Sequence, residues 1–215
     1  MRWLPAALIA GILFVAGSAW AVNPPPADDG LQLLRDYLDA LDTFSADFHQ
    51  RITDRNLDLV EDVRGRVVLK KPGRFRWDYT DPYERVIAAD GERVWLYEAD
   101  LEQVTVRRLD AGLGETPAAL LTGTADVLEH FEYRGSTVDG ELQWLSLEPR
   151  AATSDFAMIE LGFIARQLRR VSLTDRLGQQ TRIDFDDVDT TSSVADTFFR
   201  FVPPAGADVI DENDL

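Results

Sequence analysis

The chain has 215 residues, and its 38 Asp and Glu against 22 Lys and Arg give a formal net charge of -16 at pH 7. Nucleic acid and anionic lipid headgroups repel such a surface, which argues against proteins that bind either one through basic clusters. With no cysteine and two histidines, the chain forms no disulfide or thiolate metal site and has little material for a transition-metal centre, so we expect no metal and no cofactor.

The first 21 residues have the layout of a secretory signal peptide. Arg2 precedes an uncharged apolar stretch at 4–16, and Ala19-Trp20-Ala21 supplies the small residues of a cleavage site. An apolar core of about 13 residues fits a signal peptide better than a bilayer span, although an uncleaved anchor is the alternative. We therefore expect cleavage before Val22.

A proline-rich linker and then a single domain follow. Consecutive prolines at 24–26 remove N–H donors and hold the backbone extended, so residues 22–27 are predicted to be a linker. The remaining segment, 28–215, is long enough for one sizeable core. It shows neither an internal repeat nor a break in composition, and we expect one domain.

An amphipathic helix is predicted to open this domain, from Asp28 to Phe44. Its apolar residues Leu34, Leu38 and Leu41 recur three or four positions apart, which places them on one face of a helix. An acidic cap at its start agrees with this reading.

Short alternating segments then predict antiparallel β-structure. Turns rich in Gly, Pro and Asp separate them, and such close spacing makes consecutive strands neighbours. The predicted strands are 45–53, 63–71, 75–80, 85–89, 93–98, 103–109, 132–134, 142–147, 156–163, 168–174 and 180–186.

Aromatic residues gather on one side of two of these strands. Phe75, Trp77 and Tyr79 alternate with charged residues, and Trp95 and Tyr97 repeat the spacing. Aromatic residues this dense either fill a core or line a cavity, and the alternation does not choose between the two.

Two short helices interrupt the strands. Thr116-Pro117 supplies a cap and a first-turn proline for a segment at 118–121, and a second helix is predicted near 124–126. An open sheet covered by such helices leaves a groove for a ligand, whereas a closed barrel of this size fills with side chains. The residues predicted to line this groove are Phe48, Phe75, Trp77, Trp95 and Tyr97 from the sheet and Leu120 and Leu121 from the helices. For each of them, the alternative is an ordinary place in the hydrophobic core.

No catalytic motif appears in the sequence. It has no G-x-S-x-G elbow and no glycine-rich nucleotide loop. Asp184, Asp186 and Asp187 read as a solvated strand face, because Phe185 alternates with two of them, and His49 should face outward beside inward-pointing Phe48. We therefore expect no enzyme.

Two segments carry a resemblance to a known family. Residues 70–106 hold a basic residue, Pro72-Gly73, Phe-x-Trp, Asp90-Gly91 and Trp-x-Tyr in that order, and residues 198–210 hold an aromatic run, Pro-Pro, Gly and Asp-Val. This pattern resembles the LolA-type periplasmic lipoprotein carriers of Gram-negative bacteria, over nearly the whole mature chain. The resemblance implies a mostly β (α+β) fold, an unclosed antiparallel β-barrel with a helical lid over a hydrophobic cavity, in a monomeric periplasmic protein.

The resemblance also implies a cargo and partners. The family's cargo is the triacylated N-terminal cysteine of outer-membrane lipoproteins, received from an inner-membrane LolCDE-type ABC transporter and handed to the LolB-type outer-membrane receptor. That receptor has a similar fold but is itself a lipoprotein, so a chain without cysteine fits the carrier.

Lys71 occupies the position where the family most often has arginine. The resemblance implies that this side chain is a latch, bonding backbone carbonyls of the lid and letting go when cargo enters. Lysine keeps the charge but lacks the planar fork of a guanidinium, so the latch is built differently here. A surface charge at a turn is the alternative.

Two other classes of protein stay open. One is a periplasmic module that binds or senses lipid or a misfolded hydrophobic segment without trafficking it. The other is a hydrolase acting on acyl or glycosyl bonds, which needs catalytic residues in the groove that the sequence does not show.

Overall fold

The computed structural model describes residues 28–109, 121–122, 125–152 and 154–212. These residues form one α-helix, α1 (Asp28–Ala40), the 3-10 helices η1 (Ala99–Leu101), η3 (Ala125–His130) and η4 (Asp196–Phe199), and twelve strands. The strands are β1 (Thr43–Thr53), β2 (Leu59–Lys70), β3 (Arg74–Asp81), β4 (Arg85–Asp90), β5 (Arg93–Glu98), β6 (Gln103–Arg108), β7 (Phe131–Asp139), β8 (Leu142–Pro149), β9 (Phe156–Ile164), β10 (Gln167–Asp175), β11 (Gln180–Asp189) and β12 (Asp208–Asp211).

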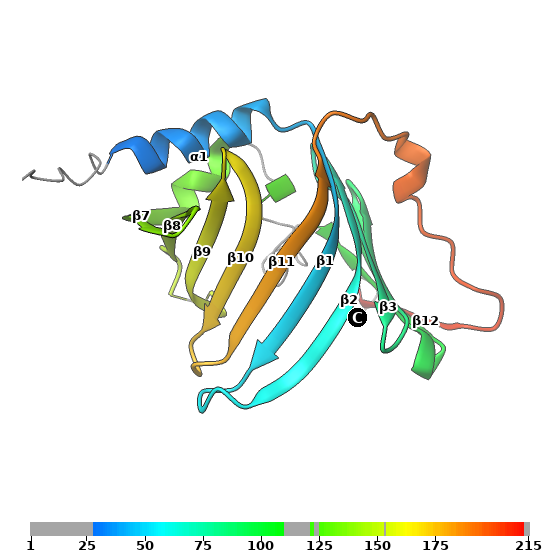
Figure 1. The fold of residues 1–215 in the computed structure, drawn as a ribbon. Coiled ribbons are helices and arrows are strands. Elements are labelled where there is room, and N and C mark those ends of the chain that lie inside the picture. Colours follow the sequence, from blue (N-terminus) through cyan, green and yellow to red (C-terminus); the bar gives the residue numbers. More distant parts are fainter. Residues whose placement is uncertain (1–27, 110–120, 123–124, 153, 213–215) are drawn as a thin grey trace, which may run out of the picture.

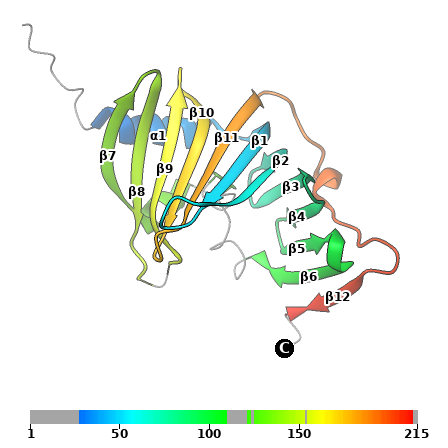
Figure 2. The same ribbon diagram turned by 60° about the horizontal axis from the view of Figure 1, so that its bottom comes forward.

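All the strands belong to one curved sheet whose ends do not meet. Its order is β12-β6-β5-β4-β3-β2-β1-β11-β10-β9-β8-β7, and neighbours are antiparallel except for the parallel pair β12 and β6. Figure 2 shows β7 and β12 at opposite ends of the sheet, so the barrel is unclosed. The predicted mostly β, open-barrel fold is confirmed.

Helix α1 crosses one face of this sheet, which we call the inner face (Figure 1). It contacts β7, β8 and η3, and its leucines join the buried side chains of β1–β3 and β8–β11 in one apolar cluster. A second, smaller cluster lies on the other side of β4–β6, which we call the outer face, and includes Phe201 from the C-terminal segment. Strands β4 and β5 therefore pack on both faces, whereas β6 contributes buried side chains to the outer cluster.

Several predicted boundaries need correction. The helix ends at Ala40 and not at Phe44, because Phe44 already begins the inward alternation of β1 with Ala46 and Phe48. Strand β7 runs well beyond the predicted 132–134, and η4 and β12 were not predicted as elements. The second short helix exists as η3.

Candidate functional site

Aromatic residues occupy the middle of the inner face. Residues paired directly across strands share a face, so the sheet register shows which side chains line it together. The rows across β1, β2 and β3 are Phe44–Leu69–Phe75, Ala46–Val67–Trp77 and Phe48–Gly65–Tyr79. Phe48, Phe75 and Trp77, all predicted from the sequence, therefore lie on one face.

Phe48 is the centre of the aromatic group. Its ring centroid lies 5.1 Å from that of Trp77 and 5.1 Å from that of Tyr79. The residue opposite Phe48 on β2 is Gly65, where an added Cβ would stand 2.9 Å from Phe48 Cε1 and 1.9 Å from the carbonyl oxygen of Asp78. The missing side chain at Gly65 thus lets the ring reach across β2 to β3.

Helix α1 covers this face with its apolar stripe. Leu33, Leu34 and Leu38 are buried against the sheet, as the periodicity predicts. Tyr37 packs edge-on against Phe163 of β9, with ring centroids 5.1 Å apart. Burial raises the pKa of the Tyr37 hydroxyl.

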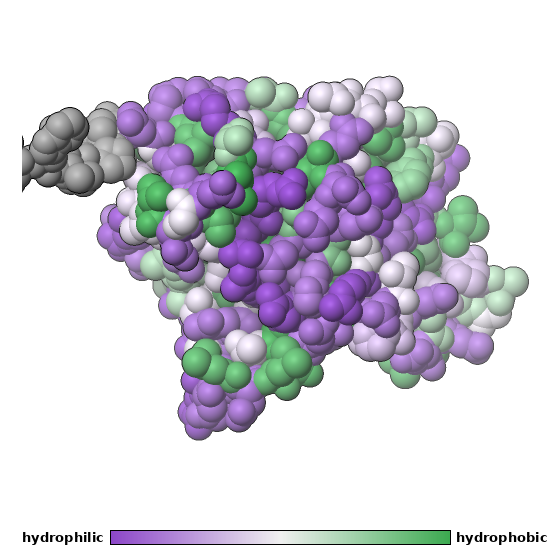
Figure 3. All heavy atoms as spheres, viewed as in Figure 1, coloured by the Kyte–Doolittle hydropathy of each residue, from purple (hydrophilic) through white to green (hydrophobic). Residues whose placement is uncertain are grey.

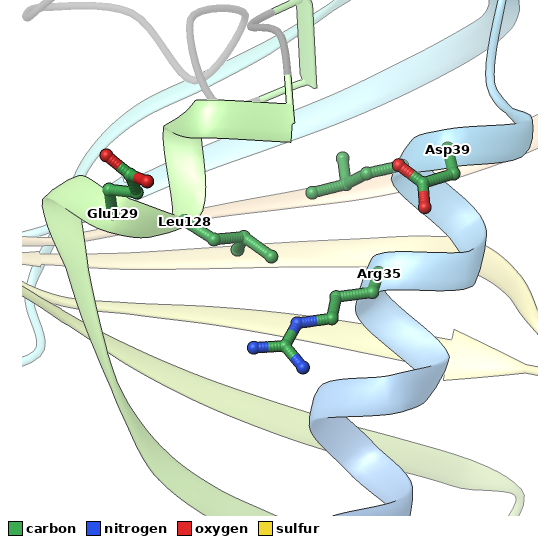
Figure 4. A pocket seen from close by; sticks show the side chains of 5 residues that line it. Arg35, Asp39, Leu128 and Glu129 are labelled. Carbon is green, nitrogen blue, oxygen red and sulfur yellow. The ribbon is translucent and has the colours of Figure 1, made fainter.

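A gap separates α1 from η3 at the edge of this cover. It is a cavity of about 310 Å³ with apolar walls from Leu38 and Leu128 and polar walls from Arg35, Asp39 and Glu129. In Figure 4 the side chains of Arg35 and Leu128 face each other across the gap. The seam between the two helices is therefore an open approach toward the leucines that cover the inner face.

Lys71 ties α1 to the sheet. Its Nζ donates to the carbonyl oxygen of Leu38, in the last turn of α1, where helix dipoles favour a cation. Burial lowers the pKa of Lys71, while the nearby carboxylates of Asp39 and Asp42 act to raise it. The side chain bonds a backbone carbonyl of a covering helix, but that helix is α1 and not one of the predicted short helices.

The short helical segment contributes one described apolar residue. Leu121 is buried in the same cluster as Phe48, and the carbonyl oxygen of Thr122 accepts the N–H of Gly73 at 3.3 Å. Leu120, the other predicted lid residue, lies outside the described residues.

Trp95 and Tyr97 lie on the outer face, so their predicted place beside Phe48 is wrong. The inner-face row runs from Trp77 through Ile87 to Leu96, and the two aromatic residues flanking Leu96 point the other way. The Tyr97 ring centroid lies 6.0 Å from that of Phe201, within the second apolar cluster. These aromatics hold the C-terminal segment against the sheet.

The remaining outer face is mostly hydrophilic, as Figure 3 shows over β9, β10, β11, β1 and β2. Asp184 accepts bonds from Arg170 and Arg51 and lies 3.3 Å from the Nε of Arg182. Desolvation, the largest single influence, raises the pKa of Asp184, but these three guanidinium groups together lower it. His49 bonds Asp62 at 2.7 Å on the same face, so the predicted outward positions are confirmed.

A shallow hollow on this face has a volume of about 360 Å³. Its lining is His49, Leu142, Ile164, Arg169, Arg170, Asp184, Phe185 and Asp186. Among the residues that the structure describes, no group of three or more His, Cys, Asp or Glu side chains is placed to hold a metal ion. Nor is any helix in this part of the chain long and apolar enough to cross a membrane.

Two inward polar residues lie beside Phe48: Tyr79, which the alternation placed with Phe75 and Trp77, and Gln50, which sequence reasoning missed. Gln50 is 7% exposed and Tyr79 is 8% exposed, and the Tyr79 hydroxyl donates to Gln50 Oε1 at 3.5 Å. Alternation from Phe48 and Trp77 predicts both positions. Neither residue was named among the predicted groove residues.

Comparison with known proteins gives a family and relatives. Residues 39–202 match the family described as outer membrane lipoprotein carrier protein LolA. An outer-membrane lipoprotein carrier protein of Nitrosospira multiformis is 39% identical over 184 residues, 85% of this chain and 89% of that protein. One of Methylobacillus flagellatus is 37% identical over 212 residues, 99% of this chain and all (100%) of that protein.

A solved structure shares the fold. A conserved protein from Thermus thermophilus has a TM-score of 0.53 at 16% identity, covering 86% of this chain and 99% of that one. At this sequence identity the similarity is evidence for a shared fold alone.

Proposed function

This chain belongs to the LolA family of outer membrane lipoprotein carrier proteins, and we propose that it shuttles acylated lipoproteins across the periplasm. In this proposal it accepts them from an inner-membrane LolCDE-type ABC transporter and delivers them to an outer-membrane LolB-type receptor. It acts by binding and not by catalysis.

The aromatic inner face under α1 is the observation that carries this proposal. Each methylene of a free acyl chain exposed to water costs about 0.8 kcal/mol, so the chains need an apolar shelter between the two membranes. Phe48, Phe75 and Trp77 supply apolar surface on one sheet face, with Leu38 and Leu121 packed against it. We propose that acyl chains take the place of part of this cover.

The same cover supports release without a nucleotide. In the empty protein the leucines of α1 already bury the inner face, so an acyl chain competes with protein side chains and its net affinity falls. The bond from Lys71 to the Leu38 carbonyl favours the form in which α1 covers the inner face, and so it favours the protein side chains over the acyl chain. Loading then needs the energy of the transporter, and delivery follows the gradient of affinity toward the receptor.

A release assay tests this proposal. Spheroplasts that synthesise a labelled outer-membrane lipoprotein are incubated with the purified protein, and the label is expected in a soluble one-to-one complex. Leu128→Glu, at the gap between α1 and η3, should reduce the yield severalfold, because it puts a charge in the apolar wall of the opening that we propose as the entry for acyl chains.

Leu177→Glu is the matched control. Leu177 is 84% exposed in the turn between β10 and β11, so the same substitution there should leave the yield unchanged. A protein that releases no label, while a known carrier does so in parallel, contradicts trafficking and points to a lipid-binding or sensor module.

A further inference from the structure

The indole of Trp77 is a buried donor on the inner face. Trp77 is 3% exposed, and its Nε1–H has no acceptor among the described residues. An indole N–H normally finds a partner when it is buried, because an unpaired donor keeps the full cost of its desolvation. The unpaired donor is therefore available to an acceptor that arrives with a ligand.

The amide of Gln50 is only partly used. A glutamine amide offers two N–H donors and two acceptor positions. Here Nε2 donates to Glu61 at 3.4 Å and Oε1 accepts from Tyr79 at 3.5 Å. Both distances lie beyond the usual range for hydrogen bonds, so Gln50 keeps capacity for a further partner although it is nearly enclosed.

These groups surround one aromatic ring. Phe48 contacts the rings of Trp77 and Tyr79, and Gln50 is the next residue on the same side of β1. We call Gln50, Trp77 and Tyr79 the polar cluster around Phe48. It combines two kinds of donor, an indole N–H and an amide, with apolar ring surface.

The polar cluster continues toward solvent. Glu61 accepts the hydroxyl of Tyr83, and the Arg85 guanidinium lies 5.1 Å from the Tyr83 ring and 5.8 Å from the Tyr79 ring. Tyr83, Glu61 and Arg85 are half-buried. A polar path thus leads from the enclosed donors to the surface, as a ligand with a buried apolar part and a solvated polar part requires.

We propose that the polar cluster around Phe48 binds the carbonyl groups that link acyl chains to their carrier, as esters or amides. The proposal rests on the proposed function and defines where the head of the cargo lies. A plain alkyl chain has no acceptor for the Trp77 and Gln50 donors, whereas an acyl carbonyl stands directly beside its own methylenes.

An anionic head group fits this place less well. Among the contacts described above, the only cation beside the cluster is Arg85. Its guanidinium already pairs with Glu98 at 3.4 Å and lies over the rings of Tyr79 and Tyr83. Glu61 beside Gln50 adds a negative charge. The local charge therefore favours a neutral acceptor.

Two synthetic lipopeptides test the proposal. They share one peptide and one chain length, but the chains are joined by esters in the first and by ethers, without carbonyls, in the second. Titration of the protein purified after export should show the ester binding about fivefold to tenfold more tightly, which corresponds to about 1.0–1.4 kcal/mol.

Three variants locate the preference. Trp77→Phe and Gln50→Leu should each bring the ester-to-ether ratio close to one. Trp144→Phe makes the same indole-to-phenyl change on the outer face, where Trp144 packs under Arg170, and should keep the ratio. Because both ligands meet the same packing, a change in the ratio reports the lost donor and not a general loosening.

The Gln50→Leu variant leaves the Tyr79 hydroxyl without its acceptor, so the double variant with Tyr79→Phe is measured beside it. If the wild-type protein binds both ligands and its ester-to-ether affinity ratio lies within twofold of one, the proposal that the polar cluster binds carbonyl groups is refuted. The proposed carrier function is not affected by that result. The same holds if the preference survives in both Trp77→Phe and Gln50→Leu. A folded wild-type protein that binds neither ligand overturns the proposed function as well.

Discussion

Replacing Gly65 by alanine should destabilise the sheet strongly. The added Cβ would meet the carbonyl oxygen of Asp78 at 1.9 Å and its carbonyl carbon at 2.9 Å, besides Phe48 Cε1 at 2.9 Å. A ring can turn aside, but the Asp78 carbonyl belongs to β3, which pairs with β2 along most of its length. Relief therefore requires two paired strands to move apart.

The expected cost follows from that geometry. Overpacking a tight interior typically costs about 1–3 kcal/mol, and a clash with backbone belongs at the upper end or beyond, so we expect about 3 kcal/mol for Gly65→Ala. In a domain of this size about 1 kcal/mol lowers Tm by about 2–4 °C, which predicts a fall of about 6–12 °C.

Thermal and urea unfolding followed by circular dichroism measure this change. Gly162→Ala is the matched control, because Gly162 also lies within a strand but its added Cβ would meet only side-chain atoms, at 3.1–3.2 Å from Leu142, Trp144 and Arg170. We expect Gly162→Ala to stay within about 1 kcal/mol of wild type. A Gly65→Ala protein that melts within 2 °C of wild type would refute the reasoning about the Asp78 carbonyl.

Three further predictions concern the helix latch, the outer face and acid stability. Lys71→Met removes the charged donor to the Leu38 carbonyl, so amide hydrogen exchange in α1 should become faster and the free energy of unfolding should fall by about 1–2 kcal/mol. Lys71→Arg should keep most of the protection from exchange and most of the stability, and unchanged exchange in Lys71→Met would contradict the latch. Tyr97→Ala should expose the segment around Phe201 to proteases while leaving the affinity for acyl ligands within twofold, and a loss of affinity would return Tyr97 to the inner site. The pKa of Asp184 is lower in the folded than in the unfolded protein, so its stabilisation is present above about pH 4 and is lost as the pH falls through the folded pKa. Asp184→Asn should therefore cost about 1–2 kcal/mol in urea unfolding at pH 7 and less at pH 3, and an equal cost at both would exclude the ionised pair as its source.

Alternation within a strand correctly predicted which side chains lie on the inner face, in the strands where only one face of the sheet is apolar. Phe48, Phe75 and Trp77 lie on the inner face as expected, and Phe185 packs against Phe44 while Asp184 faces outward. In these strands the charged outer face keeps the pattern clear, because one set of side chains meets water and the other does not.

The same reasoning failed in β5, because both faces of β5 and of its neighbour β4 are covered. Val86 and Ala88 pack on the outer cluster while Ile87 and Ala89 pack on the inner one, so β4 reads as a continuous apolar run without a preferred side. The inner position in β5 belongs to Leu96, and only the register between strands reveals it.

Long-range packing also hid the polar part of the site. Gln50 stands in sequence among charged residues and reads as solvated, yet Val63 and Ile183 flank it on the neighbouring strands and it is buried. The helix boundary failed for a related reason, since Leu41 and Phe44 continue the spacing of the helix although both belong to the chain after it.

The pairing of β1 with β11 bears on how this protein folds. Phe48 pairs with Phe185, so the centre of the sheet joins the start of the domain to a strand near its end. Folding rates fall as contacts become more distant in sequence, and β1 stays without one of its two partners until most of the chain is available. A chain that is still being synthesised therefore presents an unpaired strand edge bearing Phe44 and Phe48. Fragments that end before β11 should aggregate, whereas removal of β12, which pairs only with β6 at the sheet margin, should leave the central pairing intact.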